Sequence, residues 1–189
     1  MPISELHLER HTPNATVKVL DDLVDVYAHV YNVPPYNDDP FFTPAMFRDR
    51  LLAATELPGF ECLTAHTGGD GAMIGLVHGV TLPADRAWWV SLGVRRPAPT
   101  VADAQAGDIG WLRELMVLPE HANRGVGRRL HDEWVAGREQ RWTALTCIPD
   151  NEPAHSAYLK WGYEIIGQIK HADDSPVYDA MILKASRAA

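Results

Sequence analysis

The stretch from residue 109 to residue 147 places the tightest limit on the fold. IGWLRELMVL reads as a strand at its start, and WTALTCI reads as another strand at its end. Between them, an amphipathic helix follows a Gly-Val-Gly turn and runs to about Glu139. A crossover of this kind joins two parallel strands and is right-handed. The chain must therefore contain a sheet that at least one helix covers.

The flanking sequence adds further strands and helices. ELHLER alternates near the N-terminus as a strand does, and two strand-like runs around Gly-Gly-Asp-Gly predict a hairpin. Helices are predicted over 16–32 and after Thr43, where Pro44 takes the first helical position. Residues 83–107 are predicted to be irregular. EPAHSAYLKWG predicts a short helix, and YEIIGQI and VYDAMILK predict closing strands.

We therefore expect an α/β fold of layered α+β type. It should hold a mixed, mostly antiparallel twisted sheet of six to seven strands, flanked by about four helices. The length of 189 residues favours one domain over 1–189. Hydrophobic residues make up 46% and charged residues 22%, which is usual for a globular protein.

The same composition excludes several classes of partner. A net charge of −8 argues against a nucleic acid. No apolar run approaches the ~20 residues that span a membrane, and the N-terminus is charged where a signal peptide is apolar. Cys62 and Cys147 are expected to be core residues rather than parts of a disulfide framework, and the histidines show no metal-ligand spacing. We expect a cytoplasmic protein with no membrane, nucleic-acid or metal partner.

The glycine-rich segment PEHANRGVGRRL, residues 119–130, has three interpretations. A dinucleotide-binding turn needs a third glycine where Leu130 stands, an acid earlier than Asp150, and a strand that runs directly into the turn. A nucleotide P-loop needs Gly-Lys-Ser/Thr, and this chain has Gly-Arg-Arg. A glycine-rich helix start can also bind a diphosphate through converging backbone N–H groups. Arg124 and Arg128 would assist, although a turn without a ligand has the same features.

Two longer segments carry a family resemblance. ELMVLPEHANRGVGRRLHDEW, followed by TCIPDNEPAHSAYLKWGYEIIG, resembles the core of the GNAT superfamily of acyl-CoA-dependent N-acyltransferases. The family motif ends a strand with Val and reads Gln/Arg-x-x-Gly-x-Gly/Ala at a helix start. An Asn, an Ala, a Tyr and a Gly-aromatic pair then follow. The matching residues, within about 108–170, are Val117, Gly125, Gly127, Asn151, Ala154, Tyr158, Gly162 and Tyr163.

One departure from the family pattern concerns the start of the loop. Ala122 stands at the Gln/Arg position, and Asn123 follows where glycine is frequent. Because the loop binds mostly through its backbone, the departure implies altered anchoring of CoA rather than no binding.

The resemblance implies that an acyl-CoA, most simply acetyl-CoA, is the cosubstrate. Backbone groups of Met116 and Val117 would pair with its pantetheine arm, much as an added strand does. Asn151 would touch the same arm, although its chemistry also suits a helix N-cap. The pyrophosphate would bind the loop residues Asn123, Arg124, Gly125, Val126, Gly127 and Arg128.

The implied reaction, direct attack of an amine on the thioester, needs a base for the amine and an acid for the thiolate. By resemblance Tyr158 is the candidate acid, although a core aromatic with a satisfied hydroxyl fits equally. Glu114 is the candidate base, since it shares a strand face with apolar residues that should raise its pKa. Alternatively, a hydrogen bond or an arginine holds it as a buried carboxylate. His78 is the next candidate, or a satisfied strand histidine.

The acceptor is expected to be a primary amine on a small molecule or peptide. By resemblance, the early helices and the strand loops line its cleft. Tyr36 and Trp89, with Asp38, Asp39 and Trp88, could receive a cation, or they could be surface acids and core rings. A second copy of the chain is a possible partner. Two alternative functions stay open: an acyl-CoA sensor of the same fold without turnover, and an NAD(P)-dependent oxidoreductase.

Overall fold

The computed structural model describes residues 6–33, 36, 40–69, 71–173 and 175–185. The chain forms two compact units. The first comprises Met1–Val80 and Glu114–Gly137, and the second comprises Thr81–Arg113 and Arg138–Ala189. The boundary falls inside one strand, Ile109–Val117, which contributes to both units. A single domain over 1–189 stays a prediction beside this division.

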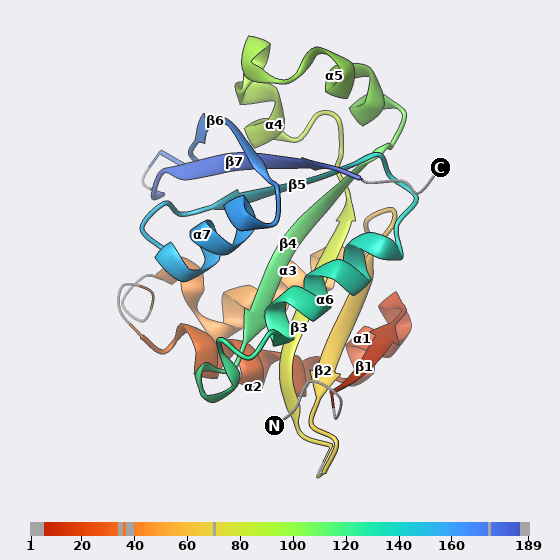
Figure 1. Ribbon diagram of the computed structural model, residues 1–189, viewed down its shortest axis with the longest axis vertical. Helices are drawn as coiled ribbons and strands as arrows, with labels where there is room; N and C mark the ends of the chain where they lie inside the picture. The colour runs from red at the N-terminus through yellow and green to blue at the C-terminus, as the bar shows by residue number, and fades with distance from the viewer. Residues whose placement is uncertain (1–5, 34–35, 37–39, 70, 174, 186–189) are drawn as a thin grey trace. The chain divides into compact units, whose positions relative to one another are not determined.

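Seven strands form one mixed sheet (Figure 1). They are β1 (His7–His11), β2 (Glu61–His66), β3 (Met73–Thr81), β4 (Ile109–Val117), β5 (Trp142–Cys147), β6 (Glu164–Ile169) and β7 (Tyr178–Lys184). The strand order is β1-β2-β3-β4-β5-β7-β6. β4 and β5 are parallel, as the crossover predicts, whereas β1–β2, β2–β3, β5–β7 and β6–β7 are antiparallel. The predicted mixed, mostly antiparallel sheet is therefore confirmed.

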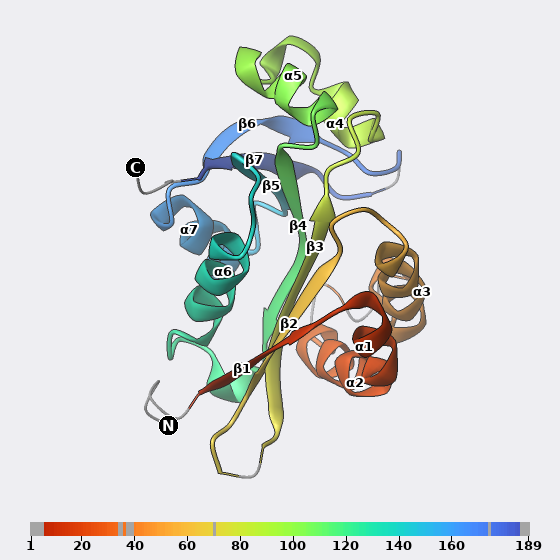
Figure 2. The same cartoon turned by 90° about the vertical axis from the view of Figure 1, so that its right-hand side faces the viewer.

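In the first unit, helices cover both faces of β1, β2 and β3. Figure 2 shows α1 (Pro13–Lys18), α2 (Leu20–Tyr31) and α3 (Pro44–Thr55) on one face and α6 (Val126–Ala136) on the other. The helix α6 buries Leu130 and Trp134 completely, at 0% exposure each. Burial of each such side chain stabilises the fold by about 1.5–3 kcal/mol. The core of this unit thus holds α6, and with it the glycine-rich turn, against the sheet.

The helix starts in the first unit agree only in part with the sequence patterns. Thr43 caps α3 as predicted, because its hydroxyl accepts a hydrogen bond from the Met46 N–H at 3.3 Å. The single helix predicted over 16–32 is wrong, since this region holds two helices. Thr12 caps an earlier start, and the backbone leaves the helical region at Val19, with φ −109° and ψ 17°.

The predicted hairpin joins β2 and β3. The Thr67 N–H donates to the Ala72 carbonyl at 3.0 Å across its turn. Both strands are almost entirely buried, because helices cover both of their faces. Cys62 lies within β2 and is fully buried, which confirms it as a core residue, and burial raises its pKa to about 12.

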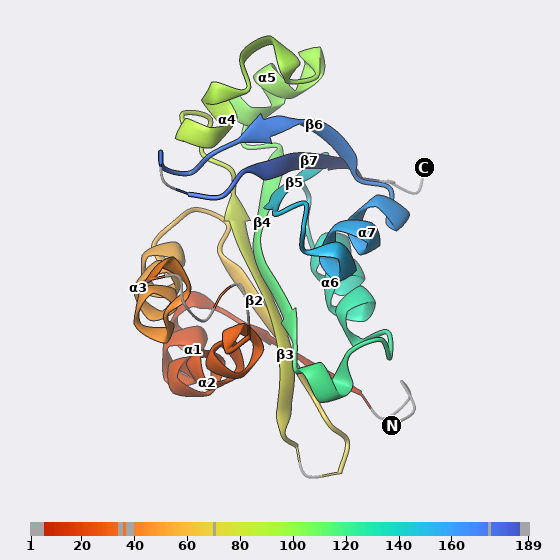
Figure 3. The ribbon, with the colours of Figure 1, turned by 90° about the vertical axis from the view of Figure 1, so that its left-hand side faces the viewer.

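In the second unit, α7 (Glu152–Lys160) lies on one side of β5, β7 and β6, and α4 (Ala87–Ser91) and α5 (Ala98–Gln105) lie on the other (Figure 3). A 3-10 helix, η3 (Gly93–Arg95), follows α4. The prediction that residues 83–107 are irregular is therefore wrong. Both helices are short, and Trp88 and Trp89 of α4 are buried at 2% and 0% exposure. Tertiary burial rather than local pattern stabilises helices this short.

Two further 3-10 helices, η2 (Pro40–Phe42) and η4 (Pro119–His121), belong to the first unit. No helix among the described residues combines the length and the apolar character that crossing a bilayer requires.

Candidate functional site

The turn between β4 and α6 has an unusual backbone at two positions. Asn123 has a φ of 58° and Gly125 a φ of 81°. A Cβ atom strains the backbone in this region, and glycine and asparagine tolerate it best. Asn123 is the sole non-glycine residue with positive φ in the described part of the chain. The departure from the frequent glycine at this position is thus one that the backbone accepts.

This turn leaves a row of donors open. Within the described residues, the backbone N–H groups from Asn123 to Gly127 make no hydrogen bond of good geometry to a backbone or side-chain acceptor, although Ala122 and Asn123 lie in a turn. The groups that flank the row are used: the Ala122 N–H donates to the Pro119 carbonyl at 3.1 Å, and the Arg129 N–H donates to the Gly125 carbonyl at 3.0 Å. The positive end of the α6 dipole lies at the same place. Open donors at a helix start can bind a phosphate.

The charged side chains of the turn are engaged to different degrees. Arg124 is exposed and forms no ion pair with any other described residue. Arg128 pairs with Asp132, with 2.6 Å between Nε and Oδ2. The His131 imidazole lies 2.9 Å from the other Asp132 oxygen. Burial lowers the pKa of His131, so this ring is neutral at pH 7. Arg124 is therefore an arginine of the turn whose charge no described carboxylate offsets.

The end of β4 lies close to the glycine-rich turn and to β3. A Cβ atom on Gly75 of β3 would lie 2.7 Å from the Met116 carbonyl oxygen, so only glycine fits there. Met116 is buried at 4% exposure, and Val117 is half-buried. A Cβ atom on Gly127 would lie 3.6 Å from Val117 Cγ2, which is an ordinary contact. The chain itself therefore leaves room for alanine at position 127.

Glu114 lies on β4 among polar partners from two helices. The Tyr31 hydroxyl of α2 donates to Glu114 Oε2 at 3.3 Å. Arg50 of α3 forms an ion pair with Glu114, with 3.5 Å between Nη2 and Oε1. These contacts agree with the alternative interpretation of Glu114, in which an arginine and a hydrogen bond hold the carboxylate in place.

The other acceptor candidates of the first unit lie in its aromatic core or beside it. His78 is buried at 2% exposure, with its ring 6.3 Å from that of Phe47 and 6.0 Å from that of Phe60. Tyr36 is half-buried, with its ring 5.0 Å from that of Tyr31. Asp38 and Asp39 lie outside the described residues. A role for either ring in binding an acceptor stays a prediction.

In the second unit, Asn151 and Tyr158 lie at opposite ends of α7. Asn151 occupies the N-cap position, but its side chain makes no capping hydrogen bond. Asn151 therefore stands at the cap position, but its side chain does not act as a cap. Tyr158 is buried at 7% exposure, edge-on to Trp161 at 5.4 Å and to Tyr163 at 5.5 Å. Its role as an acid stays a prediction.

The tryptophan candidates of the second unit lie edge to face, with 5.8 Å between the ring centroids of Trp88 and Trp89. Both are buried, and their indole N–H groups meet no acceptor within the described residues. A ring face that receives a cation must be accessible to it. In this conformation neither ring is accessible, so such a role for Trp89 would require the unit to open.

A buried polar network of the second unit carries no signal in the sequence. Asp179 of β7 accepts from His155 of α7 at 2.9 Å and from Gln168 of β6 at 3.1 Å. Asp179 pairs directly with Cys147 of β5 in the sheet. Burial, with a smaller effect of Asp179, raises the pKa of the buried Cys147 thiol to about 12. Cys147 is therefore a core residue, as predicted, and the network ties α7 to the sheet.

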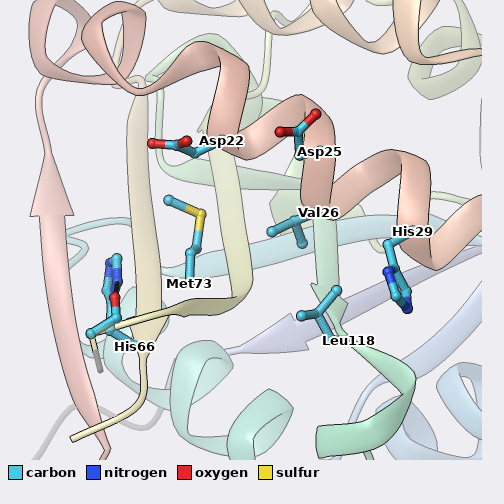
Figure 4. Close-up of a pocket in the computed structure, with 8 residues that line it drawn as sticks. Asp22, Asp25, Val26, His29, His66, Met73 and Leu118 are labelled. Atoms are coloured by element: carbon cyan, nitrogen blue, oxygen red, sulfur yellow. Dashed lines mark hydrogen bonds between the residues drawn. The ribbon is translucent and has the colours of Figure 1, made fainter. Parts of the chain in front are cut away.

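A separate cavity of about 440 Å³ opens in the first unit, with Asp22, Asp25 and His29 projecting from α2 (Figure 4). Its remaining lining residues are Val26, His66, Gly71, Met73 and Leu118. It contains none of the residues predicted to bind a cofactor or an acceptor. Among the described residues, no three His, Cys, Asp or Glu side chains gather as they would around a metal ion.

A model of the acetyltransferase (GNAT) domain matches residues 62–165, more than half of the chain. The chain belongs to the GNAT acetyltransferase family. Membership makes acyl transfer its general chemistry and acetyl-CoA the donor that the family uses. No curated protein matches the sequence.

Several solved acetyltransferases share the GNAT fold with this chain at low sequence identity. An acetyltransferase from Thermus thermophilus is 16% identical, with a TM-score of 0.64 over 98% of this chain and 100% of its own. The PaiA N-acetyltransferase of Thermoplasma acidophilum, in complex with coenzyme A, is 13% identical, with a TM-score of 0.59 over 95% and 99%. Aminoglycoside 6'-acetyltransferase type Ii is 16% identical, with a TM-score of 0.63 over 96% and 99%.

Proposed function

We propose that this GNAT protein transfers an acetyl group from acetyl-CoA to a primary amine by direct attack of the amine on the thioester. The observation that carries the proposal is the row of open N–H donors from Asn123 to Gly127 beside Arg124. Because Asn123, Arg124 and Gly125 are exposed, water can satisfy these donors, and a bound anion would take the place of that water. A pyrophosphate supplies acceptors of the right charge.

Other residues would hold the rest of the donor. The backbone of Met116 and Val117 would pair with the pantetheine arm as an added strand does. Asn151 has a side chain with no capping bond to lose, so it can bind an amide of the same arm. Arg128 would add charge, reduced by its pairing with Asp132.

The chemistry needs two proton transfers. The amine nitrogen forms a bond to the carbonyl carbon, the carbon–sulfur bond breaks, and CoA leaves as a thiolate. Glu114 would accept the proton of the attacking amine, and Tyr158 would donate a proton to the sulfur. Each assignment rests on residue chemistry and on the GNAT motif.

The test of donor binding is Gly127→Glu. The chain has room for a Cβ atom at this position, and an acidic residue in the first turn suits the helix dipole, so the fold should be kept. A carboxylate beside the open donors would compete with a pyrophosphate and repel it, and we expect CoA affinity to fall at least about tenfold by calorimetry. Gly69→Glu, where nothing lies within 4 Å of the new Cβ atom, is the matched control. Equal CoA affinity in all three proteins would overturn the proposed donor site.

The test of turnover is release of free thiol from acetyl-CoA with a panel of amines. Tyr158→Phe should reduce kcat about a hundredfold or more, the usual size of general-acid catalysis. Tyr163→Phe is the control, because its ring packs in the same aromatic group. Tight CoA binding without thiol release on any amine would indicate the acyl-CoA sensor instead. Raised thermal stability with NADH and not with CoA would indicate the oxidoreductase.

A further inference from the structure

Arg50 is a cation fixed beside the candidate base. Its Nη2 lies 3.5 Å from Glu114 Oε1, and the two side chains are only 20% and 18% exposed. Charges that are partly removed from water interact more strongly than surface pairs do. The pair is therefore a lasting feature of the first unit rather than an incidental surface contact.

Several contacts hold the Arg50 guanidinium in place. Nη1 donates to the Phe41 carbonyl at 2.7 Å, and Nη2 donates to the Tyr27 hydroxyl at 3.2 Å. The guanidinium also lies over the Phe41 ring, 4.5 Å from its centroid. These hydrogen bonds and the contact with the ring already restrict the guanidinium, so it loses little further conformational entropy when it pairs with Glu114. Arg50 therefore cannot leave Glu114 without breaking these contacts.

Arg48 of the same helix provides a contrast. It pairs with Asp21, whose side chain is 85% exposed, and this pair lies at the surface. Both arginines thus carry an ion pair from α3, but only Arg50 faces the candidate base. A change at position 48 removes a similar charge and leaves Glu114 untouched.

The groups around Glu114 balance its charge. Arg50 of α3 supplies the cation, and the Tyr31 hydroxyl of α2 occupies the second carboxylate oxygen. Tyr27 of α2 bonds to Arg50, and His78 of β3 packs beneath α3 against Phe47. An amine that approaches Glu114 therefore meets a pair of zero net charge, with a fixed positive charge a few ångströms away.

We infer that Arg50 determines acceptor specificity: it selects weakly basic amines, such as an α-amino group, and disfavours strongly basic alkylammonium ions. This inference rests on the proposed function and names its substrate class. An α-amino group, with a pKa of about 7.7–8.0, is roughly one quarter neutral or more at pH 7.5. An alkylamine, with a pKa of about 10.4, is only about 0.1% neutral. A far larger fraction of the first therefore arrives without the charge that Arg50 repels.

The reaction balances with a neutral acceptor. The amine attacks the thioester carbonyl through its lone pair, and the nitrogen then loses one proton to Glu114. The thiolate leaves and takes its proton from Tyr158. An alkylammonium ion must lose a further proton before it can attack, and it must do so beside a second cation.

The experiment compares glycinamide with n-butylamine and putrescine in wild type, Arg50→Gln, Arg50→Lys and Arg48→Gln. The readout is the ratio of kcat/KM between glycinamide and each alkylamine at one pH, so the difference in neutral fraction cancels between variants. Arg50→Gln should shift this ratio about tenfold toward the alkylamines, mainly through KM, because one charge near a half-buried site is removed. Arg50→Lys keeps the charge and should keep the wild-type ratio. Arg48→Gln should also leave it unchanged.

Two results would overturn the inference. One is a wild type that uses the alkylamines with higher kcat/KM than glycinamide. The other is a ratio in Arg50→Gln equal to that in wild type, with thermal melting showing that the variant is folded. Binding of the same amines to protein saturated with CoA, measured by calorimetry, repeats the comparison without turnover. If no amine supports thiol release, the proposed function fails, while the calorimetric contrast between Arg50→Gln and Arg48→Gln still decides the role of Arg50.

Discussion

Helices α3 and α6 belong to the same unit and begin in opposite ways. At α3, the Thr43 hydroxyl accepts from the Met46 N–H, and Pro44 removes a donor that would have no partner. At α6, Gly125 occupies the N-cap position without a side chain, and the donors from Asn123 to Gly127 stay open. A side-chain cap contributes about 1 kcal/mol. The turn before α6 forgoes this stabilisation, and its donors remain available to a ligand.

Other helix starts also differ in whether a side chain caps them. Thr12 caps α1 through the Ala15 N–H at 3.4 Å, as Thr43 caps α3. Asn151 of the second unit is a good capping residue by type, but it makes no capping bond at α7. The two helix starts that the GNAT motif assigns to CoA are thus uncapped. The helices α2, α4 and α5 also lack a side-chain cap, so it is the glycine-rich turn with its open donors, rather than the missing cap alone, that sets α6 apart.

The largest effect should come from Gly125→Ala. At a φ of 81° a Cβ atom costs about 1–2 kcal/mol, so urea denaturation should show a loss of this size. The strained turn would also redirect its neighbouring N–H groups, and CoA affinity should fall by more than about tenfold. The same loss of stability with unchanged CoA affinity would break the proposed link between this turn and the ligand.

A second, smaller effect should come from Thr43→Ala. Loss of the cap should lower the free energy of unfolding by about 1 kcal/mol, and CoA affinity should not change. Thr43→Ser keeps an accepting hydroxyl and should retain most of the stability. If Thr43→Ala weakened CoA binding as strongly as Gly125→Ala does, the division between the two helix starts would not hold.

The smallest expected effect is a change in stability at acidic pH, and it again differs between α6 and α3. Burial lowers the pKa of His131 of α6, whereas α3 contains no histidine. As the pH falls below about 6.5, His131 is protonated in the unfolded chain before it is protonated in the folded chain. The free energy of unfolding should therefore decline below about pH 6.5 and level off below the pKa of His131 in the folded chain. Burial also lowers the pKa of His11, which adds to the decline. His131→Asn should make the fall in urea-unfolding free energy less steep; an unchanged slope would exclude this role of His131.

The long, regular patterns of the sequence were sufficient for most of the fold. Alternation in β4 and the amphipathic α6 predicted the parallel pairing of β4 and β5, because a crossover has few alternatives. The Thr43 cap needed only its own three following residues. The pattern failed at α4 and α5, which are too short to show a period and depend on burial of Trp88 and Trp89.

The candidate site likewise combines features that the sequence predicted with features that depend on tertiary contacts. The position of the glycine-rich turn followed from residue types, whereas the positive φ angles of Asn123 and Gly125 were established by the structure. The partner of Glu114 did not, because Arg50 lies far away in sequence and reaches it only through the packing of α3. The network of His155, Gln168 and Asp179 also joins three separate elements. No spacing in the sequence could have indicated it.

By itself, the sequence determined where the backbone turns, where α3 is capped, and which face of β4 carries Glu114. Those features depend on atoms within a few residues of each other along the chain. The tertiary structure alone decided that Glu114 is paired with a cation and that Trp89 is covered. The charge balance and the exposure of a side chain depend on segments that meet only when the chain has folded, and it is this balance that shapes the proposed choice of acceptor.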